Sequence, residues 1–425
     1  MRILWTLLLI SGTVSAQTIP RRLTLEQAEE VALKRQPLIR ASQYTAEAAR
    51  AIITQNRSSY FPTLSANITG AGGLSGSRLA AGAINNPLVL DRFAGGLNVS
   101  QLLTDFGRTA RLVDSAKLGY KARQEDTKRA QADVLLRVDR AFFNVLRTQQ
   151  LVRVANETVS ARKTVADQVS ALARSKLKSG LDESFANTNL AEANLLLTNA
   201  QNDVAAASAE LAATMDLPPG TTFELKAPEQ VSPLPDVAGL IEQAKTNRPE
   251  IRSARLDFET AQQFAKAEGN LKRPTLSAIA SAGYTPFRDE TELRERWAAA
   301  GVNLSIPIFN GHLFSARQSE AESRALAIEQ NLRELENEVS RDVQTSWLNA
   351  RTATERVSLT NQLLNQASQG LDLAQARYDL GLSSIVELTQ AQLAKTSAEI
   401  AQANAQFDAA LARSVVDYEA GLKVK

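Results

Sequence analysis

The sequence has no cysteine, a single histidine and no enzyme-like constellation of residues. Without cysteine there is no disulfide, no thiol chemistry and no lipid anchor on an N-terminal cysteine, so stability has to come from packing or assembly. One histidine, His312, rules out a multi-histidine metal site or a catalytic triad within one chain, and we expect it to be structural. We predict neither catalysis nor a cofactor or metal.

A long apolar run is also missing after the N-terminus. The chain starts with Arg2, an apolar run from Ile3 to Ile10 and small residues ending at Ala16. This pattern is typical of a secretory signal peptide over residues 1–16, because the run falls well below the roughly 20 apolar residues that cross a bilayer. Any later membrane contact has to use interfacial helices or tilted strands. We therefore expect the mature chain to leave the cytoplasm.

The chain also has no large excess of positive or negative charge. Lys and Arg total 48 against 46 for Asp and Glu, and the charges are interspersed. This balance argues against a nucleic-acid partner and against an acidic solvating tail. Alanine, glutamine, leucine, glutamate and arginine fill long tracts that are poor in glycine and proline, a composition typical of extended helical hairpins.

The chain repeats itself. Residues 36–40 (QPLIR) are echoed by residues 248–252 (RPEIR), and residues 61–65 (FPTLS) are echoed at the same offset by residues 273–277 (RPTLS). Such a match indicates a tandem duplication. We predict a signal peptide at 1–16, a first repeat at 17–216, a proline- and glycine-rich linker at 217–235 and a second repeat at 236–425.

Each half predicts a helix, two strands, a very long helix, a tight turn and a return helix. Thr24 is placed to cap the first helix, with Gln27 three residues later, and Pro37 interrupts that helix. Residues 107–178 and 311–379 contain no proline and predict helices that reach roughly 100 Å. Their apolar positions recur every three or four residues, as in a coiled coil; one such stripe is Ile328, Leu332, Leu335, Val339, Val343 and Trp347.

The predicted strands alternate in polarity. They cover residues 64–72 and 93–103 in the first half, and in the second half they run from Leu276 to Tyr284 and from Ala298 to Ile308. Each is about the 9 to 11 residues that a tilted strand needs to cross a bilayer. Four strands cannot close a barrel, and an open edge in lipid would leave backbone groups unsatisfied, so the chain has to oligomerise. The edge of a soluble sandwich is the alternative for these strands alone.

Alternation also predicts which residues share a face. We expect lipid to meet the side bearing Leu64, Leu97, Val99, Val302 and Leu304. The alternation places Leu103 on the same side as Leu97 and Val99. We expect the lumen to meet the side bearing Asn67, Asn98, Ser277 and Asn303.

Three motifs carry a resemblance to a known family. They are residues 377–388 (RYDLGLSSIVEL), residues 61–64 (FPTL) and residues 306–311 (IPIFNG). With the repeated order of elements, they make the mature chain resemble the TolC family of outer-membrane efflux proteins over essentially its whole length. The resemblance implies a mainly α fold with a small β part: an outer-membrane β-barrel with four strands per chain, continued by a long α-helical coiled-coil barrel. It implies a homotrimer in outer-membrane lipid that reaches into the periplasm, with a periplasmic adaptor (membrane fusion protein) and an inner-membrane transporter as partners.

The resemblance also implies functional positions. Acidic residues past the second turn can ring the narrow entrance in this family; Glu387 matches the first such position, while the second is Gln390. The first turn has Ala186 where a polar latch partner would be expected. We predict that the adaptor docks at the two turns, and that bulky substitutions at the glycines there abolish export but leave the trimer intact; the turn residues are Gly180, Leu181, Gly381 and Leu382.

Two other classes of protein remain as alternatives. A periplasmic adaptor would have one hairpin flanked by compact β domains, whereas this sequence predicts two hairpins and a duplicated strand pair. A coiled-coil scaffold without a pore would be soluble without detergent, whereas a membrane pore would need detergent for extraction. The sequence does not identify the exported molecule, because a passive duct takes its specificity largely from the pump.

Overall fold

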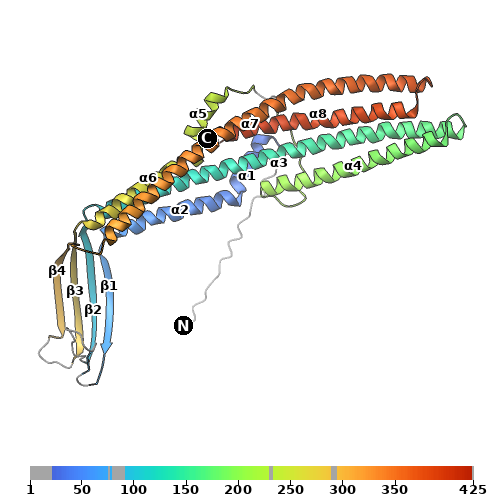
Figure 1. Ribbon diagram of the computed structural model, residues 1–425. Helices are drawn as coiled ribbons and strands as arrows, with labels where there is room; N and C mark the ends of the chain where they lie inside the picture. The colour runs from blue at the N-terminus through green and yellow to red at the C-terminus, as the bar shows by residue number, and fades with distance from the viewer. Residues whose placement is uncertain (1–21, 75–76, 79–90, 229–232, 289–293, 424–425) are drawn as a thin grey trace, which may run out of the picture. The chain divides into compact units, whose positions relative to one another are not determined.

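The computed structural model describes residues 22–74, 77–78, 91–228, 233–288 and 294–423 (Figure 1). The predicted signal peptide lies outside these residues. Within them, no helix combines the length and the apolar character needed to cross a membrane.

The helices of the two halves match one another in length. The pairs are α1 (Leu25–Arg35) and α5 (Val237–Asn247) with 11 residues each, α2 (Pro37–Arg57) and α6 (Pro249–Gly269) with 21, α3 (Arg108–Arg174) and α7 (Leu313–Asp379) with 67, and α4 (Gly180–Thr214) and α8 (Ile385–Glu419) with 35. The short 3-10 helices Ser58–Tyr60 and Asn270–Lys272 follow α2 and α6. This correspondence confirms the tandem repeat.

Local sequence explains where the first helices begin. Thr24 caps α1 with a reciprocal capping box, in which its side chain accepts from Gln27 N–H and the Gln27 side chain accepts from Thr24 N–H. Pro37 and Pro249 are the first residues of α2 and α6. Proline suits this position because its missing N–H would be unpaired there anyway.

The chain falls into two compact units. The turn unit comprises Asp133–Pro235, Ser346–Tyr418 and the N-terminal segment up to Pro37. The sheet unit comprises Leu38–Ala132, Asp236–Thr345 and the C-terminal residues from Glu419. α3 and α7 contribute to both units.

The sheet unit contains one antiparallel sheet in the order β1–β2–β3–β4. Its strands are β1 (Thr63–Ala71), β2 (Arg92–Thr104), β3 (Thr275–Arg288) and β4 (Arg296–Ser305). Three predicted details are wrong. β3 continues to Arg288 rather than ending at Tyr284. β4 ends at Ser305 rather than at Ile308, and a register shift between Leu102 and Thr104 leaves Leu103 unpaired with β3, which ends the regular alternation there.

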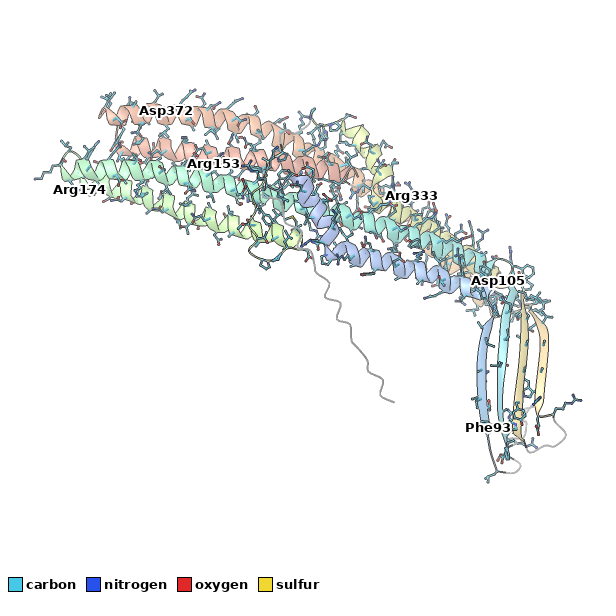
Figure 2. All side chains as sticks on the ribbon, turned by 180° about the vertical axis from the view of Figure 1, so that it is seen from behind. Phe93, Asp105, Arg153, Arg174, Arg333 and Asp372 are labelled. Carbon is cyan, nitrogen blue, oxygen red and sulfur yellow. The ribbon has the colours of Figure 1, made fainter. Side chains whose placement is uncertain are left out.

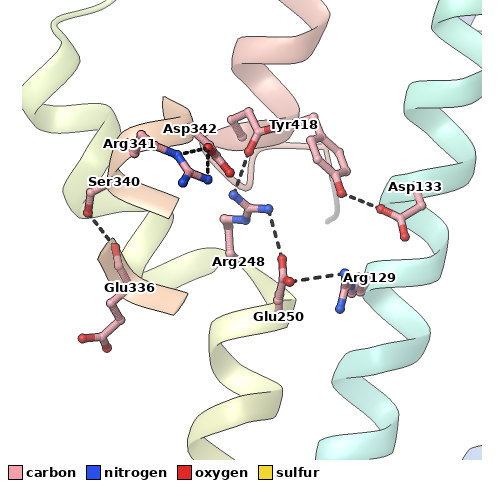
Figure 3. A network of polar contacts seen from close by, with 10 residues as sticks. Arg129, Asp133, Arg248, Glu250, Glu336, Ser340, Arg341, Asp342 and Tyr418 are labelled. Atoms are coloured by element: carbon pink, nitrogen blue, oxygen red, sulfur yellow. Dashed lines mark hydrogen bonds and ion pairs between the residues drawn. The ribbon is translucent and has the colours of Figure 1, made fainter. Parts of the chain in front are cut away.

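Ion pairs join the helices of the sheet unit. Glu268, at the end of α6, is buried between Arg108 of α3 (3.4 Å) and Arg317 of α7 (3.2 Å). Farther along, Arg248 pairs with Glu250 at 3.1 Å and with Glu419 at 2.7 Å (Figure 3). Burial raises the pKa of Glu419, and the nearby Arg248 guanidinium opposes that rise.

The turn unit packs the two hairpins, α3 with α4 and α7 with α8. Figure 2 labels Arg174 at the end of α3 and Asp372 close to the end of α7. Asn189 of α4 donates to Thr389 of α8 at 2.9 Å. The Trp347 indole donates to the carbonyl of Pro235 at 2.9 Å, so the end of the linker is tied to α7.

Left-handed residues mark both strand-to-helix junctions. Phe106 and Gly107 have φ of 53° and 96° before α3, and Gly311 and His312 have φ of 60° and 65° before α7. His312 therefore occupies in the second half the position that Gly107 occupies in the first.

Candidate channel surfaces and entrance

The sheet presents two faces of different polarity. Cross-strand partners lie on the same face of a sheet, and the register pairs Leu64 with Val99 and Ser65 with Asn98. One face, here called the apolar face, bears Leu64, Ile68, Leu97, Val99, Val302 and Leu304. The other, the polar face, bears Asn67, Asn98, Ser277, Ser281 and Asn303. The four predicted lumen residues thus share one face.

No described element of the chain packs over either face of the sheet. Every residue of β4 is exposed, and so is every residue of β1 except Ala71. On the apolar face Ile68 is 77% exposed and Val302 is 68% exposed. A soluble domain would bury such side chains, so this face needs another apolar environment.

Large side chains depart from the alternation at several positions, and sequence reasoning missed them. Leu102, which pairs with Ser277 on the polar face, is one of them. Ile279 and Trp297 lie on the polar face, because Ile279 pairs with Gly301 and Trp297 pairs with Gly283. The signal was available for Trp297, which is an even number of residues from Asn303. Its indole lies against the backbone of Gly283 and Gly96.

The first turn, residues 175–179, ends α3 and starts α4. Lys176 has a left-handed φ of 59°, and its N–H and that of Leu177 donate to the carbonyls of Ala173 and Leu172. This bonding pattern is a Schellman motif. Ser179 then caps α4 with a reciprocal box to Asp182. Gly180 is the first residue of α4 and has open space around it, so helix termination rests on Lys176.

The second turn, residues 380–384, ends α7 with the same motif. Gly381 has φ of 71°, its N–H donates to the Tyr378 carbonyl, and the N–H of Leu382 donates to the Arg377 carbonyl. Glycine is favoured here because it adopts a left-handed φ without strain. Gly381 in the second turn is therefore the counterpart of Lys176 in the first.

Glu387 lies in the first turn of α8 and has a partner that the sequence did not suggest. Arg377 Nε donates to Glu387 Oε1 at 3.0 Å across the second turn. The N–H of Glu387 also donates to Ser384 Oγ at 3.4 Å. Gln390 is exposed one helical turn later. An arginine ten residues before the glutamate is meaningful only once the chain has folded back.

A small apolar core joins the two hairpins beside the turns. It contains Val165, Ala166, Val169, Ala186, Tyr378, Ile385 and Leu388. Ala186 is only 3% exposed, so the expected position of a polar latch is filled by core packing. Tyr378 is buried, with Lys178 Nζ 4.5 Å from its ring centroid. Burial raises the pKa of Tyr378, and the carboxylates of Asp182 and Asp379 add to the rise.

Leucines remain exposed at both turns. Leu177 and Leu382 stand at equivalent positions of the two Schellman motifs, and Leu181 is exposed just inside α4. The residue at this position commonly packs back on its own helix. In this protein the side chains of Leu177 and Leu382 are instead 71% and 65% exposed.

The sequence profile of one protein family covers most of the chain. The family described as outer membrane efflux protein matches residues 30–215 and residues 240–414. The chain belongs to this family. Its two matched segments fall in the two halves of the tandem repeat, and members of the outer membrane efflux protein family are channels of the outer membrane that extend into the periplasm.

Two relatives align over most of their length. The outer membrane protein TolC of Vibrio cholerae serotype O1 is 24% identical over 413 residues, which is 89% of each chain. The solvent efflux pump outer membrane protein SrpC of Pseudomonas putida is 26% identical over 398 residues, 89% of this chain and 81% of its own.

Solved structures have the same fold. The outer membrane protein VceC from Vibrio cholerae superposes with a TM-score of 0.79 at 19% identity, over 93% of this chain and 96% of its own. CusC superposes with a TM-score of 0.78 at 18% identity, over 93% and 92% of the two chains. The predicted fold class is confirmed.

Proposed function

We propose that three copies of this chain form a passive export duct across the outer membrane and the periplasm, fed by an inner-membrane transporter through a periplasmic adaptor. The observation that carries this proposal is the sheet, whose polar and apolar faces are both uncovered and whose edge strands, β1 and β4, pair on one side only among the described residues. Backbone groups at an open edge cannot be left unpaired in lipid. Edge-to-edge pairing between copies satisfies them and places lipid on one face and water on the other.

In this arrangement the apolar face meets lipid and the polar face lines the channel. Neighbouring residues of β2 provide a matched test, because Leu97 lies on the apolar face and Asn98 on the polar face. Leu97→Arg should cost about 2 to 4 kcal/mol of barrel stability, if it lies near the bilayer midplane. Asn98→Arg should be nearly neutral. The readout is the heat resistance of the assembled oligomer on gels, and equal loss in both variants would refute the face assignment.

The entrance, in this proposal, lies at the two turns, with Glu387 of each copy forming an acidic ring. Closely spaced carboxylates in a constriction concentrate negative potential and favour cations. Arg377 partly neutralises that potential within each copy. Glu387→Gln should therefore weaken the cation preference measured by reversal potentials in a salt gradient, and Arg377→Gln should strengthen it. Unchanged preference in both variants would remove Glu387 from the selectivity ring.

The exposed leucines of the turns are the surface on which an adaptor would dock. Leu177→Asp and Leu382→Asp should reduce crosslinking to the adaptor and abolish export, while oligomers still form. Leu393, exposed farther along α8, provides the control substitution Leu393→Asp, which should leave export intact. Loss of the oligomer in the turn variants would assign these leucines to assembly instead.

A further inference from the structure

One row of residues crosses all four strands on the polar face. Asn67 of β1 pairs with Gly96 of β2, Gly96 pairs with Gly283 of β3, and Gly283 pairs with Trp297 of β4. The row contains one large side chain and two glycines between it and an amide. This combination differs from the rest of the polar face, where small polar side chains predominate.

Ring atoms of Trp297 lie against both glycines. A carbon built as Cβ on Gly283 would come within 2.6 Å of Trp297 Cε2, and one built on Gly96 would come within 3.0 Å of Trp297 Cζ2. Both distances are shorter than normal contacts between carbon atoms. A Cβ would also come within 2.6 Å of the Gly95 carbonyl oxygen at position 283 and within 3.0 Å of the Ala282 carbonyl oxygen at position 96. Glycine is therefore required at both positions by the backbone and by the ring, and the ring packs against β2 and β3.

The ring is only partly covered. Trp297 is 39% exposed, although its ring atoms lie against β2 and β3. Covering a glycine with a cross-strand aromatic side chain protects the backbone, which accounts for the covered side. It does not account for the amide of Asn67 at the far end of the same row. Nor does it account for Asn98 and Ser281, which are cross-strand neighbours on the same face.

We propose that Trp297 and Asn67 form a subsite in the channel wall for planar aromatic solutes that carry a hydrogen-bonding group. An aromatic ring stacks on the exposed part of the indole in an offset arrangement, and the Asn67 amide donates to or accepts from its polar substituent. The subsite rests on the proposed function in one respect, because it requires the polar face to line the channel. It recurs once in each copy around the pore.

Tryptophan fluorescence offers a direct test. The sequence has three tryptophans, and one of them, Trp5, lies within the predicted signal peptide. Trp347 belongs to the turn unit, so Trp347→Phe leaves Trp297 as the reporter without touching the row. The purified oligomer carrying this change is placed in vesicles of ordinary or brominated phosphatidylcholine and titrated with nicotinamide, a planar aromatic amide.

We expect no quenching by brominated lipid and a saturable quenching curve with nicotinamide. Asn67→Ala should raise the half-saturation concentration roughly twofold to tenfold, the range that one modest contact contributes. Gly283→Ala should abolish saturation because the ring is displaced. Asn303→Ala changes an amide in another row of the same face and should have no effect.

The failures of the two proposals are distinguishable. Quenching of Trp297 by brominated lipid would place the polar face against the bilayer and would overturn the face assignment, and the subsite with it. If brominated lipid does not quench and nicotinamide gives only a linear, collisional curve, the polar face is wet but the subsite does not exist. Equal weakening by Asn67→Ala and Asn303→Ala would also overturn it.

Discussion

The two helical turns occupy equivalent positions in the two halves of the repeat, where the flanking helices have equal lengths. The residues that form the two turns nevertheless differ. Each long helix ends in a Schellman motif, with Lys176 in the left-handed position of the first turn and Gly381 in that of the second. Each return helix has an acid at its third residue. Asp182 closes a capping box with Ser179, whereas Glu387 pairs with Arg377 across the turn.

This difference separates two roles. In the first turn the Asp182 carboxylate is bonded to the backbone and side chain of its own N-cap residue, Ser179. The left-handed residue of this turn is Lys176, which is strained in that conformation. The second turn has a strain-free left-handed residue and directs its acid towards a guanidinium that is exposed to solvent. The two turns are repeats of one another, but only the second has a carboxylate, that of Glu387, in an ion pair with an exposed arginine.

The largest expected difference concerns two alanines at the seventh residue of the return helices. Ala186 is buried in the core beside the turns, and Ala391 is half-buried. Ala186→Asp places a carboxylate in an apolar site and should cost about 3 kcal/mol or more, whereas Ala391→Asp should cost much less. Thermal unfolding of the solubilised oligomer measures both, and similar losses would contradict the asymmetric core.

Exchanging the left-handed residues should have the next largest effect. Gly381→Lys introduces a strain of about 1 to 2 kcal/mol, and Lys176→Gly should relieve a comparable strain. Hydrogen exchange of the amides on either side of each turn reports this locally. Gly180→Ala is the control, because Gly180 is helical with open space around it and should tolerate the change. Destabilisation by Lys176→Gly would show that the lysine side chain has another role.

The caps should differ by a smaller amount. Ser179→Ala removes a reciprocal box and should destabilise the start of α4 by about 1 kcal/mol. Ser384→Ala removes one contact of 3.4 Å and should cost clearly less. Amide exchange in the first turns of α4 and α8 gives the comparison. Equal effects would mean that Ser384 caps α8 as strongly as Ser179 caps α4.

Tyr378 should give the smallest effect at neutral pH. Its hydroxyl is buried and has no hydrogen-bond partner among the described residues, so Tyr378→Phe should be neutral or stabilising by up to about 1 kcal/mol. The folded-state pKa of Tyr378 is raised, so the folded chain holds this proton more tightly than the unfolded chain does. Stability should therefore fall as the pH rises above about 10, the ordinary tyrosine value, and this fall should be weaker in Tyr378→Phe. Parallel alkaline titrations of thermal stability decide the point.

Much of the fold followed from local sequence. Thr24 with Gln27, Pro37 and the proline-free stretches predicted the helix starts and lengths, because caps and proline act within a few residues. The alternation of β1 and β2 predicted the shared faces correctly up to the register shift at Leu102. A bulge adds one residue on one strand only, and nothing in the polarity of Leu102 or Leu103 indicates it.

The candidate site was less predictable. Lysine does not favour a left-handed φ, so the Schellman motif at Lys176 is not visible in the sequence, where Gly180 is the turn residue that stands out. The Arg377–Glu387 pair depends on the return of the chain through the second turn. The polarity pattern does not single out Trp297, because one aromatic residue among small ones contributes little to it. The contact of Trp297 with Gly96 joins strands that are far apart in the sequence, so it is visible only in the folded sheet.

The matched helix lengths limit how such a chain can change during evolution. α3 and α7 both have 67 residues, and α4 and α8 both have 35. A heptad inserted into one hairpin alone would leave about two turns in each of its arms without neighbours to cover their apolar stripes. Only indels that affect all four arms together preserve the packing. We therefore expect the hairpins to change in length in steps of about one heptad, each of which requires matching insertions or deletions in both halves of the gene.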